Sequence, residues 1–93
     1  MEGKKYDEGK LRWDLLPVAP VKMIVMILTF GAKKYGDNNW QGVSIDRYYA
    51  ALCRHLIAWR EGEKFDDESK IHHLAHVMVN AMFIVWKEFN QAK

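Results

Sequence analysis

The sequence has little cysteine, little proline and little net charge: one cysteine, two prolines and a formal charge of +2 in 93 residues. A lone Cys53 cannot form an internal disulfide, so a fold held together by disulfide bonds is excluded. The small charge gives no bulk attraction to a nucleic-acid polymer, and any anion site must therefore be local. Residues 21–30, the most apolar early run, are about half the ~20 residues of a membrane span and include Lys22. We therefore expect neither a membrane nor a nucleic-acid polymer as a partner.

The composition that is present is typical of a folded globular protein, with 49% hydrophobic and 28% charged residues. A chain of this length is expected to form a single domain over residues 1–93. The opening stretch MEGKKYDEGK lacks the apolar segment of a signal peptide. Together with the single cysteine, this predicts a cytoplasmic location.

Helical periodicity predicts an all-α fold with three main helices, near residues 20–35, 45–61 and 67–90. The third helix should begin at the acidic DDES segment, because acids favour the positive end of a helix dipole. Residues 1–16 show no sustained period and are expected to form an irregular arm that packs its aromatic side chains onto the helices.

Turn and capping residues predict where the helices begin and end. Gly36 and Gly62 should end the first and second helices, and Ser44 or Asp46 should cap the second. Residues 77–86 are apolar on every side of the last helix except at one asparagine. A three-helix monomer cannot easily cover such a segment, so a homo-oligomer is expected.

Three polar side chains, His73, His76 and Asn80, fall on one line of the last predicted helix, where they can face His55 of the helix before it. Neutral imidazoles in this arrangement can bind a transition metal such as Zn²⁺. They can also donate hydrogen bonds to an anionic or nucleotide ligand. In the third interpretation they bond to each other and to buried water, and set the helix register.

A second line lies on the predicted helix 45–61, where Arg47, Ala51 and Arg54 follow one another at i, i+4 and i+7. The alanine leaves room between two guanidinium groups, which match phosphate oxygens in bidentate fashion. The alternative is a solvated face with surface ion pairs to Asp46 or Glu61. The pattern is consistent with a site for the phosphates of a nucleotide.

Acidic side chains crowd the connection between the last two helices: Glu61, Glu63, Asp66, Asp67 and Glu68. A Mg²⁺ site for pyrophosphate chemistry needs several carboxylates around one or two hard cations. Solvated turns and helix N-termini also collect acids without any metal. Both interpretations remain open at this point.

The segment FGAKKYGDNNW combines residues that suit a nucleotide. Lys33 and Lys34 can contact phosphates, Asn39 can bind base edges, and Tyr35 and Trp40 can stack on a base. Each also has a structural role: lysine complements a helix C-terminus, asparagine forms turns, and Trp40 can anchor the loop.

The ordered set KLRWDLLP, FGAKKYGDNNW, RHLIAWREGEKFDDES and HHLAHVMVN resembles a family of small bacteriophage proteins labelled dATP/dGTP diphosphohydrolase, N-terminal domain. The resemblance runs from about Tyr6 to Glu88. It implies kinship with the all-α nucleoside triphosphate pyrophosphohydrolases of the MazG and MazZ type. It thus implies MazG-like helical packing, oligomers, and Mg²⁺-dependent cleavage between the α and β phosphates.

The chain departs from the metal-binding pattern of those enzymes, which place EExxE on one helix and ExxD on the next. Here the matching helices carry ALCRHL and HLAHVMVN, which are basic or neutral. A hydrolase would therefore have to hold Mg²⁺ or Mn²⁺ with the acids of the connection: Glu61, Glu63, Asp67 and Glu68. The departure also favours a second class of function. Small oligomeric phage sponge proteins, which this chain resembles in size, sequester nucleotide signals of host immunity without cleaving them.

We predict a nucleotide site lined by the last two helices and the 33–40 segment. Its expected residues are Lys33, Lys34, Tyr35, Asn39, Trp40, Arg47, Arg54, His55, His73, His76 and Asn80. The leading hypothesis is an anti-defence sponge in the host cytoplasm that needs no cofactor and holds a nucleotide or nucleotide-derived immune signal. The first alternative is a dATP/dGTP pyrophosphohydrolase using Mg²⁺ or Mn²⁺. The second is a structural or partner-binding helical module.

Overall fold

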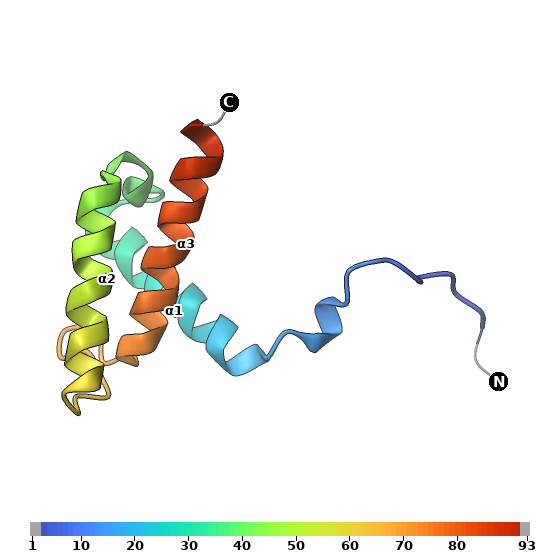
Figure 1. Cartoon of the computed structure of the whole chain (residues 1–93), viewed down its shortest axis with the longest axis horizontal. Helices are drawn as coiled ribbons and strands as arrows, with labels where there is room; N and C mark the ends of the chain where they lie inside the picture. Colours follow the sequence, from blue (N-terminus) through green and yellow to red (C-terminus); the bar gives the residue numbers. More distant parts are fainter. Residues whose placement is uncertain (1–2, 92–93) are drawn as a thin grey trace.

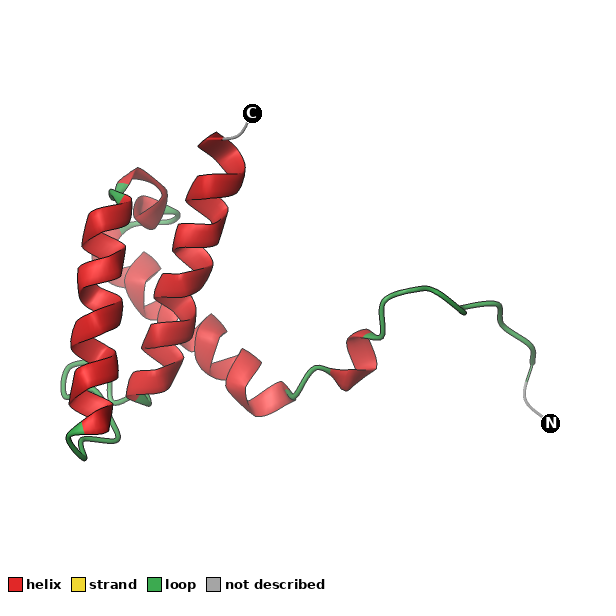
Figure 2. Cartoon of the chain, in the orientation of Figure 1, coloured by secondary structure: helices red, strands yellow, loops and turns green. Residues whose placement is uncertain are grey.

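The protein consists of three α-helices preceded by an extended segment (Figure 1, Figure 2). The computed structural model describes residues 3–91. Within these residues no β-strand forms, and a single isolated antiparallel bridge joins Phe65 to His72. The predicted all-α class is confirmed. In chain order the elements are η1 (Trp13–Leu15), α1 (Val18–Tyr35), η2 (Asn39–Gly42), α2 (Ile45–Arg60) and α3 (His73–Gln91), where η marks a short 3₁₀ helix.

Helices α2 and α3 are antiparallel neighbours, and α1 crosses them obliquely (Figure 1). The most extensive packing is between α2 and α3, and α1 also packs on α3. Residues 61–72 connect the end of α2 to the start of α3. Within residues 3–91, α1 and α2 do not pack directly on each other. Space for a cleft is therefore left between α1 and α2.

Glycines end α1 and α2 at the predicted positions. Gly36 has a φ of 100° and donates its N–H to the carbonyl of Ala32. Gly62, shortly after α2, has a φ of 105°. A side chain with a Cβ is strained at these φ values, so glycine is favoured. Ser44 occupies the N-cap position of α2, but its side chain makes no capping hydrogen bond.

The third helix begins at His73 and not near residue 67, so this prediction was wrong. Residues 66–71 form a turn in which the N–H of Asp66 donates to the carbonyl of Ile71 and the N–H of Lys70 donates to the carbonyl of Asp66, both at 2.8 Å. The Asp66 carboxylate accepts the N–H of Ser69 at 2.8 Å, and Lys70 is left-handed with a φ of 64°. These side-chain and turn hydrogen bonds replace the helical ones.

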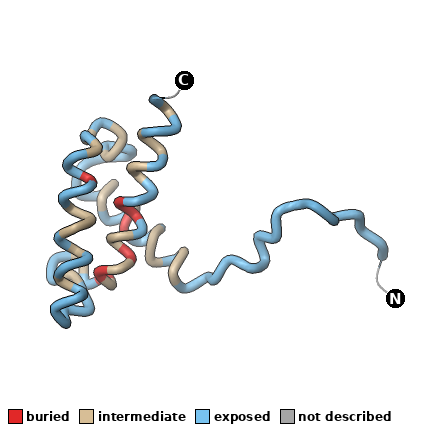
Figure 3. Tube along the Cα trace, viewed as in Figure 1, coloured by how far each residue is buried: buried red, intermediate tan, exposed pale blue. Residues whose placement is uncertain are grey.

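The arm also differs from expectation, because it leaves the helical body and does not pack on it (Figure 1, Figure 3). Tyr6 is 85% exposed and Trp13 is 74% exposed. The hydrogen bonds found along the arm are local, such as the ion pair between Arg12 and Asp14 at 2.8 Å. Without a regular period, these residues present no continuous apolar face to the helices. The expectation of a packed arm was therefore wrong for this chain.

Removing residues 1–12 is expected to leave the free energy of unfolding unchanged to within about 0.5 kcal/mol, because residues 3–12, the described part of this segment, are all exposed. Thermal unfolding followed by circular dichroism measures this directly. A fall in melting temperature of more than about 5 °C, equivalent to roughly 1 kcal/mol for a domain of this size, would show that the arm is packed in solution.

The core is small and centred on α3. Its buried cluster consists of Ile27, Ile71, Ala75 and Val79, and side chains from α1 and Phe83 pack around it. Apolar side chains nearer the end of α3 are left uncovered, including Val85. Such a face suits contact with another chain. Oligomerisation and MazG-like packing remain predictions.

Candidate functional site

A cleft of about 890 Å³ opens between α1 and α2, with α3 and the Asp66 turn as its floor and end. This volume lies in the range of small-molecule and cofactor sites. Its charged and polar lining comes from three separate parts of the chain: the end of α1 with the following loop, α2, and the 66–69 turn with α3. The predicted site residues that line it are Lys34, Tyr35, Asn39, Trp40, Arg47, Arg54, His55, His76 and Asn80.

Two predicted residues do not line the cleft. Lys33 is exposed on α1, about 100° around the helix from Lys34. His73 is buried behind His55 at the start of α3. The cleft therefore brings together most of the predicted set, while the binding roles of its members remain predictions.

The α2 wall carries the positive charge of the cleft. Arg47 and Arg54 both line it, with Ala51 between them. Neither guanidinium has an ion-pair or hydrogen-bond partner among residues 3–91, and the surface pairs considered from the sequence, with Asp46 and Glu61, are not formed. By contrast, Lys34 on the facing helix is bonded to Glu68. Two free guanidinium groups are thus available to an anion.

Trp40 has a structural contact that the sequence left open. Its ring stacks on Phe83 of α3, with centroids 4.4 Å apart and an angle of 11°, and meets the edge of Trp86 at 4.9 Å. The loop after α1 is therefore anchored to α3 through this ring. Tyr35, which also lines the cleft, is 62% exposed.

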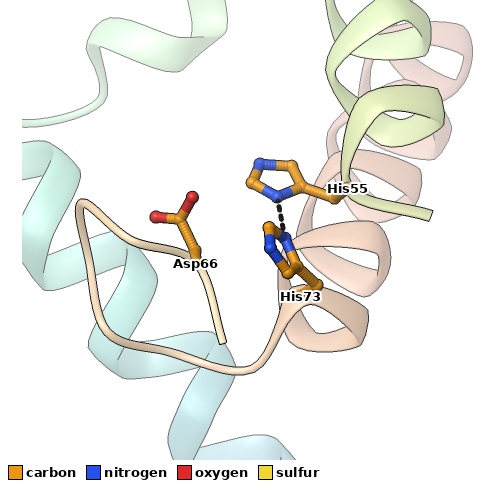
Figure 4. A group of neighbouring side chains, drawn as sticks. All are labelled: His55, Asp66 and His73. Atoms are coloured by element: carbon orange, nitrogen blue, oxygen red, sulfur yellow. Dashed lines mark hydrogen bonds between the residues drawn. The ribbon is translucent and has the colours of Figure 1, made fainter. Parts of the chain in front are cut away.

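Three histidines meet at one end of the cleft. His55 Nδ1 lies 2.8 Å from His73 Nδ1, and the rings of His55 and His76 stack at 4.3 Å with an angle of 8°. The Asp66 turn closes the cluster, since Ser69 Oγ lies 2.7 Å from His76 Nε2. Figure 4 shows the side chains of His55 on α2, Asp66 on the connection and His73 on α3.

The protonation of this cluster follows from its burial. Burial, followed by the positive charge of His76, lowers the pKa of His55 to about 4. Burial also lowers the pKa of His76, although the Asp66 carboxylate opposes this shift. For Asp66 burial acts to raise the pKa, but hydrogen bonds from Ser69 and the nearby imidazoles outweigh it, and the net pKa is lowered. At neutral pH the imidazoles of His55 and His76 are therefore neutral and lie beside the Asp66 carboxylate.

Asn80 completes the predicted polar line on α3, but its amide is already engaged. The side-chain nitrogen donates to the backbone carbonyl of His76 at 2.8 Å. The side-chain oxygen is the part of Asn80 left for a ligand or for water. The polar line thus combines structural bonding with the lining of the cleft.

The structure disperses the four acids proposed to hold Mg²⁺. Glu61 and Glu63 line a separate hollow of about 440 Å³. Asp67 is paired with Lys70 at 3.2 Å, and Glu68 is bonded to Lys34. Because α3 starts at His73, the connection spreads these carboxylates over different surfaces. The residues therefore do not fit a Mg²⁺ site of the expected kind.

Two residues that organise the site, Asp66 and Ser69, were not among the site residues predicted from the sequence, although Asp66 belongs to the acidic group considered for Mg²⁺. Asp66 lies within the histidine cluster, with its Oδ2 3.8 Å from His76 Nε2, and Glu63 Oε1 lies 3.4 Å from His73 Nε2. The spacing of aspartate and serine at i and i+3 is typical of a side-chain-capped turn. This spacing is the sequence feature from which the turn could have been predicted.

Fold and site together define a small all-α domain with a basic cleft and an imidazole cluster at its end. The chain belongs to the family described as dATP/dGTP diphosphohydrolase, N-terminal, whose model matches residues 1–93. The resemblance found in the sequence motifs is thereby confirmed.

A curated relative supports the same family. The dATP/dGTP diphosphohydrolase of Salmonella phage PMBT28 is 37% identical over 86 residues. The match covers 92% of this chain and 30% of that protein, so the chain spans about a third of the relative's length. No solved structure matches the chain. Among the helices of residues 3–91, none combines the length and apolar character needed to cross a bilayer.

Proposed function

We propose that the chain binds a purine deoxynucleoside triphosphate in the cleft between α1 and α2 and takes part in its hydrolysis. The family description and the printed name of the phage relative both support this substrate class. They favour hydrolysis over the sponge hypothesis, because the relative is named a diphosphohydrolase.

The observation that carries the proposal is the pair of unpartnered guanidinium groups, Arg47 and Arg54, on one wall of an 890 Å³ cleft. Residues at i and i+7 lie two turns apart, roughly 10 Å along the helix axis, which is on the scale of a triphosphate chain. Arginine binds phosphate oxygens bidentately, and Ala51 leaves the space between the two side chains open.

Other residues of the cleft suit the rest of the ligand. Lys34 reaches the cleft from the end of α1 and can exchange its bond to Glu68 for one to a phosphate. Tyr35 offers an exposed ring for the base, and Asn39 offers amide groups for its edge. The base would thus lie near the loop after α1, and the phosphates along α2.

In the proposed reaction, a water oxygen bonds to the α-phosphorus while the bond from that phosphorus to the bridging oxygen breaks. The products are a deoxynucleoside monophosphate and pyrophosphate. Arg47 and Arg54 would stabilise the charge that develops on the phosphate oxygens. The neutral imidazole of His76 can accept a proton at this end of the cleft. No step is assigned to Mg²⁺, because the acids expected to hold it do not converge.

Sequestration without cleavage is the second candidate, and one observation favours it. The cleft faces of α2 and α3 carry Arg47, Arg54, His76 and Asn80 in place of carboxylates. Such a site retains affinity for phosphates but lacks acids on these helices to position a metal-activated water.

The test is to measure binding of dATP, dGTP and dCTP by calorimetry, and then to identify the recovered nucleotide by ion-exchange chromatography. We expect binding of the purine nucleotides, weakened about 10- to 100-fold by Arg47→Ala or Arg54→Ala, from the energy of a charge-assisted hydrogen bond. The matched control is Arg60→Ala, an exposed arginine of α2 that does not line the cleft.

The recovered species separate the two candidates. Monophosphate and pyrophosphate from the unmodified protein, reduced in the Arg54 variant, support hydrolysis. Intact nucleotide supports sequestration and contradicts hydrolysis by this chain. Failure of the unmodified protein to bind any of the three nucleotides contradicts both.

A further inference from the structure

We propose that His55, Asp66 and His73 form a binding site for a divalent transition-metal cation of the Zn²⁺ type. This site goes beyond the proposed function, and it differs in residues and ligand chemistry from the Mg²⁺ site considered from the acids of the connection. Imidazole nitrogen and a carboxylate oxygen are ligands that Zn²⁺ and its neighbours take in proteins.

The ligand atoms are already gathered. One ligand atom from each of the three side chains lies within 4.8 Å of the other two. Ligands bonded to Zn²⁺ at about 2.0–2.2 Å lie roughly 3.3–3.6 Å apart in a tetrahedron. The two Nδ1 atoms, at 2.8 Å, need to separate by a few tenths of an ångström, which small side-chain rotations allow.

The His73 side chain has a hydrogen-bonding problem that a cation resolves. Its Nδ1 faces the Nδ1 of His55 at 2.8 Å, where one nitrogen donates the proton and the other accepts it. Its Nε2, however, is buried and has no hydrogen-bond partner in residues 3–91. Its side chain is only 6% exposed. A buried polar atom left in this state costs about 1–3 kcal/mol.

A metal between the two Nδ1 atoms would replace their hydrogen bond, take both lone pairs as ligands and place the His73 proton on Nε2. There it faces Glu63, whose Oε1 lies 3.4 Å away. A carboxylate that accepts the second N–H of a metal-bound histidine is a recurrent feature of metal sites. Glu63 would then be a positioning residue that orients the His73 ring, once the distance from its carboxylate to Nε2 shortens to that of a hydrogen bond.

Neighbouring residues hold the side chains of Asp66 and His55 in orientation. Asp66 Oδ2 accepts the backbone N–H of Ser69 at 2.8 Å, and this bond orients the carboxylate. The ring of His76 stacks on His55 and holds its plane. Three ligands from α2, the connection and α3 are thus arranged before any metal binds, which lowers the entropic cost of binding.

Three protein ligands leave a fourth position open, as in catalytic rather than structural zinc sites. His55 and Asp66 both line the large cleft together with Arg54. The open position would therefore face the cleft and accept water or a phosphate oxygen.

The experiment uses the full chain, freed of metal by chelation and dialysis, with no nucleotide present. Zn²⁺ affinity is measured by competition with a chromophoric chelator, and Co²⁺ is added as a spectroscopic probe. We expect one ion per chain, visible Co²⁺ bands of a four-coordinate site, and a melting temperature raised by roughly 10 °C at about 100-fold excess of Zn²⁺ over its Kd.

Five variants separate the metal ligands from residues that do not bind the metal. His55→Gln, His73→Gln and Asp66→Asn are each expected to weaken Zn²⁺ binding by about 100-fold or more, because even outer-sphere partners contribute 10- to 100-fold. Glu63→Gln should weaken it by about 10-fold. His72→Asn is the matched control: His72 lies outside the cluster, and asparagine keeps an acceptor for the N–H of Leu74.

The proposal is overturned if the unmodified protein takes up neither Zn²⁺ nor Co²⁺, or if folded Asp66→Asn and His55→Gln proteins bind Zn²⁺ as tightly as the unmodified one. Circular dichroism of each variant establishes that it is folded. Since no nucleotide is present, a negative result here leaves the nucleotide proposal untouched, and failure of nucleotide binding leaves the metal result untouched.

Discussion

Replacement of Trp40 by alanine is expected to lower the free energy of unfolding by about 3 kcal/mol. Removal of a packed aromatic side chain typically costs about 3–5 kcal/mol. The lower figure applies because this ring is only partly buried. It is stacked on Phe83 and meets the edge of Trp86, and aromatic pairs add to the effect of area alone. Urea unfolding followed by circular dichroism measures the change without relying on the fluorescence of the deleted indole.

Trp13→Ala is the matched control, because this residue lies on the arm and is 74% exposed. Its removal should change stability by less than about 0.5 kcal/mol. Trp40→Phe retains a stacking ring and should recover much of the loss. If Trp40→Ala left stability unchanged but abolished nucleotide binding, Trp40 would be a base-stacking residue, as the sequence suggested, and not an anchor.

The second large effect is expected for Ile71→Ala, with a loss of about 2–4 kcal/mol in the free energy of unfolding. Ile71 is 7% exposed and belongs to the buried cluster with Ile27, Ala75 and Val79. The core has few members, so neighbouring side chains cannot easily fill the cavity that alanine would leave.

The control for Ile71 is Ile57→Ala on α2, where the same side chain is 56% exposed and the expected loss is below about 1 kcal/mol. Urea midpoints at unchanged slope give the comparison. Equal losses in the two variants would contradict the assigned core. They would instead indicate that the exposed face of α2 is covered in solution.

The three helices could be predicted because their evidence is local. Apolar residues recur at helical spacing. Gly36 and Gly62 follow the helix ends, where the backbone takes a positive φ that would strain any other L-residue. The turn before α3 was not predicted, because DDES fits a helix start as well as it fits a turn. The turn is made by the bonds of Asp66 to Ser69 and Ile71, and an aspartate followed three residues later by a serine is compatible with either structure.

The arm illustrates the same limit. Aromatic and leucine side chains in residues 3–16 suggested packing, because apolar groups gain free energy on burial. Burial also requires a surface within reach, and the chain turns away from the body before α1 (Figure 1). Composition alone carries no information about this direction.

For the candidate site, helical spacing was sufficient for Arg47 and Arg54, since residues on one helix keep their relative positions whatever the helix packs against. It also placed His76 and Asn80 on a common face. Spacing could not show that Lys34 would pair with Glu68, or that Trp40 would be anchored on Phe83. These contacts join residues far apart in the chain.

The sequence alone therefore decided the helical class, the helix ends at glycine and the line of guanidinium groups on α2, because backbone geometry over a few turns determines each of them. Only the tertiary structure decided which acids lie at the histidines. It placed Asp66 within the cluster and Glu63 3.4 Å from His73 Nε2, and it put Glu61, Asp67 and Glu68 on other surfaces. The physical reason is that a loop takes its path from hydrogen bonds and packing across the fold, and these bring together atoms that sequence spacing cannot relate.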